Sequence, residues 1–223
     1  MAARLTEYHS LADVYEFLTP EALLTPAGNV AAFAPWLPRP PARVLDCACG
    51  IGLLAAGLAR AGYDAHASDI SPEMVARTRA LGVDARVRDW AQLPPSGDCD
   101  AVLCVGNSLP HTPDRRGALA AMAGALRPGG ALLLTSRNWE REQPGGSEEV
   151  QRGGRRLRIT RVWTPGRPTR LKLTVGTVTE VLTVWPFTYD ELLTDLRAAG
   201  FEVEISTFTP DSERYLVKGV RPL

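Results

Sequence analysis

The sequence lacks the features that mark several specialised classes of protein. It has no excess of either charge, because 25 Lys and Arg residues stand against 25 Asp and Glu residues. A chain without net positive charge has no overall field to attract phosphates, so we expect no nucleic-acid partner. Gly and Pro, at 20 and 18 of 223 residues, are too few for a collagen-like or low-complexity chain. The uncharged stretch 22–38 contains Pro26, Gly28 and Pro35, which exclude a membrane-spanning helix, so we expect no membrane partner.

The four cysteines have spacings unlike those of zinc sites. Cys47 and Cys49 are separated by one residue, and Cys99 and Cys104 by four, whereas a zinc knuckle has a gap of two. All four stand in apolar runs, where a buried free thiol is the ordinary state. The first 18 residues carry several charges and contain no apolar core of a signal peptide. We therefore predict a reduced, metal-free protein of the cytoplasm.

From residue 42 onward, short apolar runs alternate with helical patterns, which is typical of a parallel sheet with crossover helices. We predict helices at 51–61, 72–81 and 117–126, and strands at 43–47, 65–68, 85–88, 100–105 and 131–136. Thr188 and Glu191 form a capping box that opens a further helix, which ends at Gly200. Strands at 202–206 and 215–220 follow closely enough to form an antiparallel hairpin.

A glycine-rich turn follows the first predicted strand, within residues 44–52. Ala48, Gly50 and Gly52 are small enough to let the backbone approach a ligand, as in dinucleotide-binding folds. The spacing differs from the dehydrogenase fingerprint G-x-G-x-x-G, because an alanine stands where the third glycine belongs. The carboxylate of Asp46 would repel a pyrophosphate but attract an ammonium group. The turn therefore suits S-adenosylmethionine, which has a zwitterionic aminoacyl end and a cationic sulfonium.

Two further acidic groups follow the next two predicted strands. Asp69 ends the second strand, where an acid can accept hydrogen bonds from both ribose hydroxyls. Asp89 and Trp90 follow the third strand and place a polar acceptor and an aromatic face where an adenine would lie. Asp69 alone could merely cap the next helix. Three such groups at consecutive strand ends favour a ligand site, because open α/β sheets bind ligands at that edge.

These motifs resemble those of class I S-adenosylmethionine-dependent methyltransferases. Residues 44–52 resemble the first family motif, Asp69–Met74 the second, Asp89–Pro94 the third and Leu126–Gly130 the turn that follows the site. The resemblance implies an α/β fold, with a Rossmann-like seven-stranded sheet, helices on both faces and an antiparallel last strand. It also implies that S-adenosylmethionine is the cofactor and S-adenosylhomocysteine the product.

We predict a single domain, 1–223, with four segments: a helical lid at 1–40, the cofactor-binding core at 41–140, an antiparallel insertion at 150–186, and a C-terminal helix with a strand hairpin at 187–223. The insertion is expected because polar and apolar residues alternate there, in two or three strands with Pro165 and Gly166 in one turn. A basic run lies between Arg152 and Lys172. It could attract an anionic substrate, or be the solvated face of edge strands, which we favour.

A narrower resemblance connects Gly106–Asp114 and Ser136–Trp139 with glycine N-methyltransferases and their glycine/sarcosine relatives. It implies that Asn107 and Arg137 face the substrate, with Arg137 binding its carboxylate, and that Ser108 and His111 line the cofactor. Those enzymes have an arginine upstream of the first motif that helps hold the cofactor carboxylate, but residues 5–38 here contain none, and Tyr8 and Tyr15 are the candidates to replace it.

From these observations we predict the site residues. His111 and Asn107 are the catalytic candidates, because a histidine can take a proton and an amide can orient an amine. Arg137, Asn138 and Asn107 are the predicted substrate-binding residues, although Arg137 could instead form a surface salt bridge. The predicted cofactor-binding residues are Tyr15, Asp46, Ala48, Gly50, Gly52, Asp69, Ile70, Met74, Asp89, Trp90, Val105, Ser108 and His111.

The predicted function is methylation of a small molecule, at the nitrogen of an amine or an amino-acid-like substrate. Three alternatives stay open at this point: an O-methyltransferase of a natural-product scaffold, a cofactor-binding protein that does not catalyse, and a nicotinamide-dependent oxidoreductase. The sequence leaves the acceptor unidentified, and it also leaves open whether the chain forms a homo-oligomer.

Overall fold

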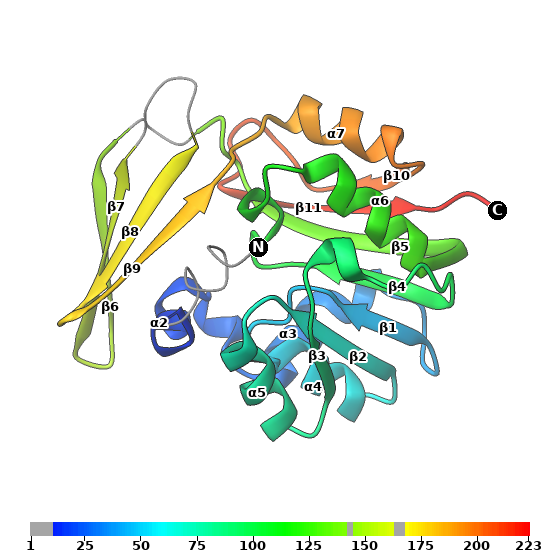
Figure 1. The fold of residues 1–223 in the computed structure, drawn as a ribbon, viewed down its shortest axis with the longest axis horizontal. Helices are drawn as coiled ribbons and strands as arrows, with labels where there is room; N and C mark the ends of the chain where they lie inside the picture. The colour runs from blue at the N-terminus through cyan, green and yellow to red at the C-terminus, as the bar shows by residue number, and fades with distance from the viewer. Residues whose placement is uncertain (1–10, 142–144, 163–167) are drawn as a thin grey trace.

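A computed structural model describes residues 11–141, 145–162 and 168–223, with the side chains of 11–13 left aside (Figure 1). Its main sheet has the strands β1 (Arg43–Asp46), β2 (Asp64–Asp69), β3 (Asp84–Val87), β4 (Cys99–Cys104), β5 (Leu126–Arg137), β10 (Glu202–Ser206) and β11 (Arg214–Val220). The strand order is β10-β11-β5-β4-β1-β2-β3. The predicted Rossmann-like seven-stranded sheet is confirmed.

The directions of the strands decide what lies at each edge of this sheet. Strands β1 to β5 are parallel to one another, whereas β11 is antiparallel to both β5 and β10, which confirms the predicted hairpin. Because β11 runs backwards, its first residues lie beside the carboxyl ends of the parallel strands. In the ladder, Arg214 is opposite Arg137 and Tyr215 is opposite Ser136.

Helices cover both faces of the main sheet. The α-helices are α2 (Leu11–Leu18), α3 (Pro26–Phe33), α4 (Leu53–Arg60), α5 (Pro72–Ala80), α6 (Arg115–Ala125) and α7 (Tyr189–Ala198), with short 3-10 helices η1 (Glu21–Leu23), η2 (Ala34–Trp36), η3 (Trp90–Gln92) and η4 (Leu109–His111). In Figure 1, α6 and α7 lie on one face and α3, α4 and α5 on the other. Successive side chains of β5 point to opposite faces of the sheet. Leu132 and Leu134 lie in the core under α6 and α7, and Leu133 lies in the core on the other face.

The capping residues predicted at the helix ends make the expected hydrogen bonds or have the expected backbone conformation. Ser71 accepts a hydrogen bond from the backbone N–H of Met74 at the start of α5. Thr188 and Glu191 make both bonds of the capping box that opens α7. Gly82 and Gly200 follow the ends of α5 and α7 with positive φ, a conformation that a glycine adopts without strain.

The insertion has more strands than predicted. It is a four-stranded antiparallel sheet of β6 (Ser147–Arg152), β7 (Arg155–Val162), β8 (Thr169–Val175) and β9 (Val178–Val184), where two or three strands from residue 150 were expected. Strand β6 escapes detection because it is an edge strand that carries mostly polar residues. The predicted turn at Pro165 and Gly166 lies outside the described residues.

Helix α2 packs against this second sheet. Val14 and Phe17 of α2 join Leu157, Ile159 and Leu173 in one apolar cluster. Figure 1 shows α2 between the insertion strands and α3. Within the described residues, no helix is long and apolar enough to cross a bilayer. The N-terminal helix therefore lies where it can contact both the insertion and the edge of the main sheet.

Candidate active site

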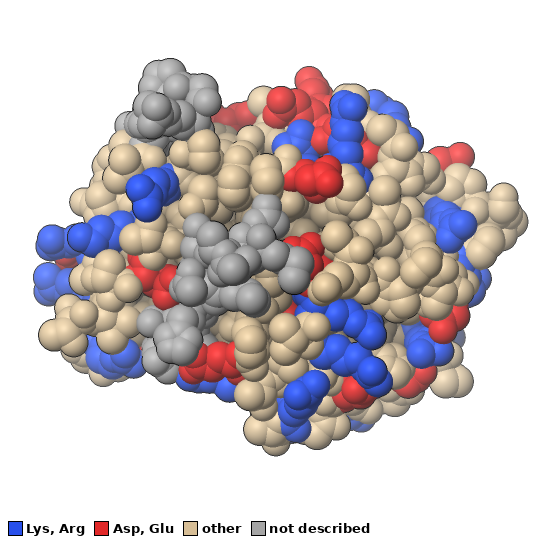
Figure 2. Space-filling model, viewed as in Figure 1, with Lys and Arg blue, Asp and Glu red and all other residues tan. Residues whose placement is uncertain are grey.

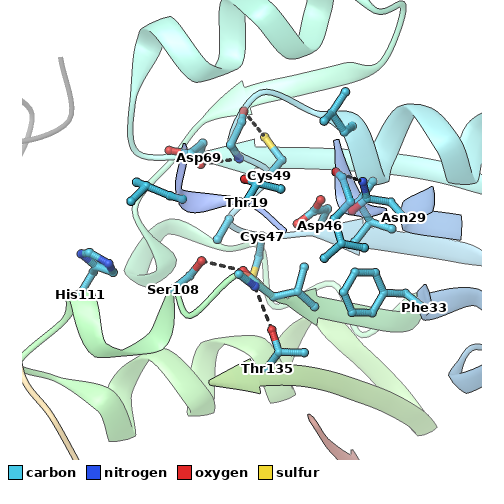
Figure 3. A pocket seen from close by; sticks show the side chains of 18 of the residues that line it. Thr19, Asn29, Phe33, Asp46, Cys47, Cys49, Asp69, Ser108, His111 and Thr135 are labelled. Atoms are coloured by element: carbon cyan, nitrogen blue, oxygen red, sulfur yellow. Dashed lines mark hydrogen bonds between the residues drawn. The ribbon is translucent and has the colours of Figure 1, made fainter. Parts of the chain in front are cut away.

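A cavity of about 480 Å³ opens at the carboxyl edge of the main sheet, within the size range of small-molecule sites (Figure 3). Its walls come from the ends of β1 to β5, from η4, from the start of β11, from α2 and α3, and from β9 of the insertion. The sites expected after the first three strands thus meet in one place. Of the predicted cofactor-binding residues, all except Gly52 line this cavity.

Asp46 ends β1 inside this cavity and is 2% exposed. Its Oδ1 atom accepts no hydrogen bond from the part of the chain that the structure describes. Burial, followed by the nearby charge of Asp69, raises the pKa of Asp46 to about 7, although a backbone N–H at Ala48 opposes the shift. A buried carboxylate oxygen without a partner is costly, and a cationic or N–H-donating ligand would relieve the cost.

The glycine-rich turn meets the cavity at Gly50. Gly50 has φ +53°, and a Cβ atom there would lie 2.7 Å from the ring of Tyr15. Its backbone N–H donates to Oδ2 of Asp69 over 2.9 Å. Gly52 behaves differently, because a Cβ there would lie 2.6 Å from the hydroxyl of Thr78 on α5. Gly52 therefore permits close packing against α5, and unlike the other predicted cofactor-binding residues it does not line the cavity.

Asp69, at the end of β2, is held in place by backbone donors. Its Oδ1 accepts from the N–H of Ser71 over 2.9 Å, while its Oδ2 accepts from Gly50. Burial raises the pKa of Asp69, and these bonds oppose the increase. Each carboxylate oxygen has a second lone pair, so both oxygens can accept from ligand hydroxyls as well. Ile70 and Met74 line the cavity next to it.

Asp89 and Trp90 shape the cavity beyond β3. Asp89 accepts a hydrogen bond from the N–H of Ala91 over 3.0 Å and caps η3. The indole N–H of Trp90 donates to the carbonyl of Cys47 over 2.8 Å, which fixes the ring against the first turn. Trp90 and Cys47 both line the cavity. The aromatic face of Trp90 is therefore held on the cavity wall.

Tyr15 closes the cavity from the N-terminal side. Its ring lies against Gly50, and burial, together with the charge of Asp46, raises the pKa of its hydroxyl to about 12. Asn29 and Phe33 of α3 extend the same wall. The sequence pattern gave no reason to choose these two residues, because which face of α3 reaches the cavity depends on how α3 packs on α4.

Beyond β4, the wall is built by hydrogen bonds around η4. Ser108 Oγ donates to the carbonyl of Val105 over 2.8 Å, and the N–H of Gly106 donates to Oγ1 of Thr135 over 2.9 Å. His111 ends η4 and lines the cavity, and burial lowers the pKa of its imidazole to about 4. His111 is therefore neutral at pH 7.

The three predicted substrate-binding residues do not line this cavity. Oδ1 of Asn107 accepts from the N–H of Arg137 over 2.9 Å. A guanidinium nitrogen of Arg137 lies 3.7 Å from Glu148 of β6, as in the salt-bridge alternative. Asn138 is 2% exposed and donates to the carbonyl of Pro210 over 3.2 Å. These polar groups fix the chain around the end of β5, so the structure does not bring them together with the cofactor-binding set.

Other residues occupy the wall in their place. Ser136, Arg214 and Tyr215 line the cavity from β5 and β11, and Leu182 lines it from β9. Arg214 and Tyr215 could have been predicted from the antiparallel direction of the last strand, because that direction brings the start of the strand to the edge where the cavity opens. None of the described basic residues between Arg152 and Lys172 lines the cavity. Figure 2 shows Lys and Arg side chains over the second sheet, at the left edge of the view, as expected for a solvated face.

Comparison with known proteins agrees with this geometry. Residues 44–130 match a family described as "Methyltransferase domain". Residues 44–130 are a class I methyltransferase domain. The cofactor of this family is S-adenosylmethionine. The unpartnered Asp46 oxygen, the paired backbone donors at Asp69 and the fixed ring of Trp90 fit its ammonium, ribose and adenine groups.

The methyltransferase domain has curated relatives with different acceptors. A ubiquinone biosynthesis O-methyltransferase of Xanthomonas campestris pv. campestris is 40% identical over 107 residues, which cover 44% of each chain. A glycine/sarcosine N-methyltransferase of Parasynechococcus marenigrum is 39% identical over 122 residues, which cover 50% of this chain and 43% of that protein. The matches span less than half of the length of these relatives.

Solved structures resemble almost the whole chain. The CcbJ methyltransferase of Streptomyces caelestis has a TM-score of 0.82 at 18% identity, with 99% of both chains covered. The amino pentose methyltransferase CalS10 of Micromonospora echinaspora, solved with S-adenosylmethionine bound, has a TM-score of 0.75 at 24% identity, with 96% and 97% covered. At these identities the likeness shows the fold, so the methyltransferase domain and its insertion share one known architecture.

Proposed function

We propose that the protein transfers a methyl group from S-adenosylmethionine to a small molecule, at the nitrogen of an amine or an amino-acid-like acceptor. The observation that supports this most is the buried Asp46 carboxylate, which has an oxygen without a partner among the described residues and shares one cavity with Asp69 and Trp90. The curated relatives include both N- and O-methyltransferases, so the class of accepting atom is part of the proposal.

The cofactor half of the cavity extends from β1 to β3. Asp46 accepts from the ammonium group, Asp69 accepts from the ribose hydroxyls, and Trp90 lies along the adenine. Ala48 and Gly50 let the backbone come close, and Ile70 and Met74 provide apolar contacts next to the ribose. When bound, the cofactor supplies an activated methyl group on a good leaving group. What the chain must add is alignment, which can be worth an effective molarity of about 10⁵ M or more.

The other half of the cavity, beyond β4, is the acceptor half, where the methyl acceptor would bind. Its polar groups His111 and Tyr215 are uncharged and can orient the acceptor by hydrogen bonds. His111 has a pKa of about 4, so it suits a hydrogen-bonding role better than that of a strong base. Burial raises the pKa of Tyr215 to about 12, so its hydroxyl keeps its proton. An amine acceptor must arrive neutral, since an ammonium has no lone pair, and these groups can hold it in that form. Asn107 supports the site indirectly, through its bond to the backbone of Arg137.

The described part of the N-terminal segment, residues 11–40, acts as a lid over the cofactor. Its α2 is tied to the insertion, since Arg155 contacts Glu16 over 3.0 Å and Arg152 donates to the carbonyl of Thr19 over 3.0 Å. Tyr15 and Leu18 on the same helix line the cavity. The lid (1–40), the core (41–140), the insertion (150–186) and the C-terminal segment (187–223) are thus a working division of the chain.

A labelled-methyl transfer screen over amines, amino acids and phenols, with products identified by mass, tests the proposal. We expect methylated amines. Methylated hydroxyls instead would favour an O-methyltransferase, and S-adenosylhomocysteine binding without any turnover would favour a non-catalytic cofactor-binding protein. Protection from unfolding by a nicotinamide nucleotide, and none by S-adenosylmethionine, would reject the cofactor assignment.

A pair of variants tests the cofactor half. Asp69→Ala should weaken S-adenosylhomocysteine binding by about 1.5–3 kcal/mol, as expected for loss of hydrogen bonds to a charged group. Asp84→Ala is the matched control, because Asp84 begins β3 at the opposite end of the strands and does not line the cavity. Equal affinities for the two variants in calorimetry would reject the ribose role.

A further inference from the structure

The charged residues around the cavity are divided between its two halves. Asp46, Asp69, Asp89 and Arg88 belong to the cofactor half, at the ends of β1, β2 and β3. On the other half, beyond β4, Arg214 is the one charged residue among the described lining residues, since His111 is neutral. The acceptor half is therefore cationic, while the cofactor half is predominantly acidic.

The two arginines cannot serve the same ligand group. Arg88 follows β3 and Arg214 begins β11, and the strand order places five strand spacings between them. At about 4.8 Å per spacing, their backbones are about 24 Å apart. Arg88 stays with the cofactor half, and Arg214 is the cation that a methyl acceptor would meet.

Arg214 lies at the start of β11, which is held in place by packing of the neighbouring Tyr215. It is exposed at the rim, while the next residue, Tyr215, is 4% exposed and lines the cavity. The Tyr215 ring contacts the rings of Tyr189 and Phe208 edge-on, with centroids 5.5 and 5.3 Å away, and these contacts fix the first residues of β11. A guanidinium has five N–H donors in a planar fork, so it can bind a carboxylate even when one donor has another partner.

Arg137 is the natural comparison, since it faces Arg214 across the β5–β11 ladder. It does not line the cavity, and its guanidinium lies 3.7 Å from Glu148. Arg161 donates to the same glutamate over 2.9 Å. Two arginines therefore share one acidic partner of the insertion, Glu148.

We propose that the methyl acceptor carries a carboxylate and that Arg214, at the rim of the cavity, binds it. The accepting nitrogen then points inward to Ser136, His111 and Tyr215, and Leu182 and Leu18 border the apolar part between the two ends. This inference rests on the proposed methyl transfer and names its substrate class. It assigns the carboxylate to Arg214 instead of Arg137.

The test pairs each carboxylic acid with its uncharged amide of similar shape, which removes the carboxylate charge, and rates are compared at equal concentrations of neutral amine. The pairs are glycine and glycinamide, phenylalanine and phenylalaninamide, 4-aminobutyrate and 4-aminobutanamide, and 3,4-dihydroxybenzoate and 3,4-dihydroxybenzamide. Methyl transfer is measured for the wild type, Arg214→Gln, Arg214→Lys and Arg137→Gln. The affinity for S-adenosylhomocysteine is measured alongside, as a check on folding and on the cofactor half.

We expect the wild type to prefer acids. Arg214→Gln should raise KM for the acids about tenfold and leave KM for the amides, kcat and S-adenosylhomocysteine affinity unchanged, and Arg214→Lys should restore part of the loss. Equal losses on acids and amides would overturn the inference, as would a preference for amides or a preference abolished by Arg137→Gln instead. Cofactor binding without transfer to any acceptor would reject the proposed function itself, and the inference with it.

Discussion

Two buried aspartates show how one residue type can be used in opposite ways in this fold. Asp195 on α7 is 3% exposed and accepts from Arg115 over 2.5 Å and from Arg116 over 2.6 Å. Asp46 is 2% exposed and has an oxygen with no partner in the described chain. Burial acts against the charge of both, but the two guanidinium groups lower the pKa of Asp195, whereas the pKa of Asp46 rises to about 7.

The difference separates a carboxylate that holds the fold from one that is available to a ligand. Asp195 joins α6 to α7, and the guanidinium of Arg115 also lies over the ring of Phe187, 4.7 Å from its centroid. Oδ1 of Asp46 has no partner among the described residues, so we expect the ligand-free protein to be less stable with this carboxylate than with a neutral residue. An unpartnered buried charge at a strand end is therefore a more specific sign of a ligand site than burial or charge alone.

The largest effect should come from Asp195→Ala. Removing one partner of a buried ion pair costs about 3–5 kcal/mol, and we expect about 3 because Arg116 is 69% exposed. Thermal and urea unfolding measure the loss. Arg116→Ala, which keeps the Arg115 pair, should cost clearly less. The folded fraction of Asp195→Ala should bind S-adenosylhomocysteine as the wild type does, and weakened binding there would show that the two aspartates are not independent.

The next largest effect is expected at Asp46, where a substitution should lower ligand affinity and raise the stability of the ligand-free protein. Asp46→Asn should weaken S-adenosylhomocysteine binding by about 1.5–3 kcal/mol, because a charge-assisted bond to the ammonium becomes a neutral one. The same change should raise the melting temperature of the ligand-free protein at pH 8, where it removes an unpaired charge. Calorimetry and thermal unfolding measure the two quantities. A variant that loses both affinity and stability would mean that Asp46 is structural.

The dependence of stability on pH should distinguish the two aspartates further. The pKa of Asp46 is higher in the folded than in the unfolded state, so its contribution to the free energy of unfolding should fall as pH rises from about 4 to about 7. The pKa of Asp195 is lower when folded, so its contribution is present above about pH 4 and is lost in acid. In urea unfolding of ligand-free protein from pH 4.5 to 8, Asp46→Asn should remove the Asp46 contribution, while those of Asp69 and His111 stay, and Asp195→Asn should keep all three. Parallel profiles for Asp46→Asn and the wild type would contradict this account.

The smallest effect should come from Gly50→Ala. The new methyl group would lie 2.7 Å from the Tyr15 ring and push the lid away from Asp46, so cofactor affinity should fall by about 1 kcal/mol. Gly82→Ala is the matched control, since Gly82 also has positive φ but no atom within 4 Å of its would-be Cβ. Both variants should lose stability through backbone strain, and only Gly50→Ala should also lose affinity.

The sequence allowed the sheet and the cofactor half to be predicted, because both depend on short-range signals. A strand end, a tight turn and a helix cap stand within a few residues of one another, as at Asp46 and Gly50 or at Asp69 and Ser71. The acceptor half could not be predicted in the same way. Arg214 and Leu182 reach the cavity only because β11 and β9 lie where the tertiary fold puts them. Arg137 is the last residue of β5 and does not line the cavity, which could not be predicted because sequence position does not give the direction of a side chain.

The contact between α2 and the insertion has a consequence for engineering. Phe17 of α2 packs with Leu157 and Leu173 of the second sheet, while Tyr15 on the same helix closes the cofactor cavity. A chimera that replaced only the insertion strands with those of another methyltransferase would separate Tyr15 from the sheet that supports it. Residues 11–18 and 147–184, although more than 120 positions apart in the chain, should therefore be exchanged as one module.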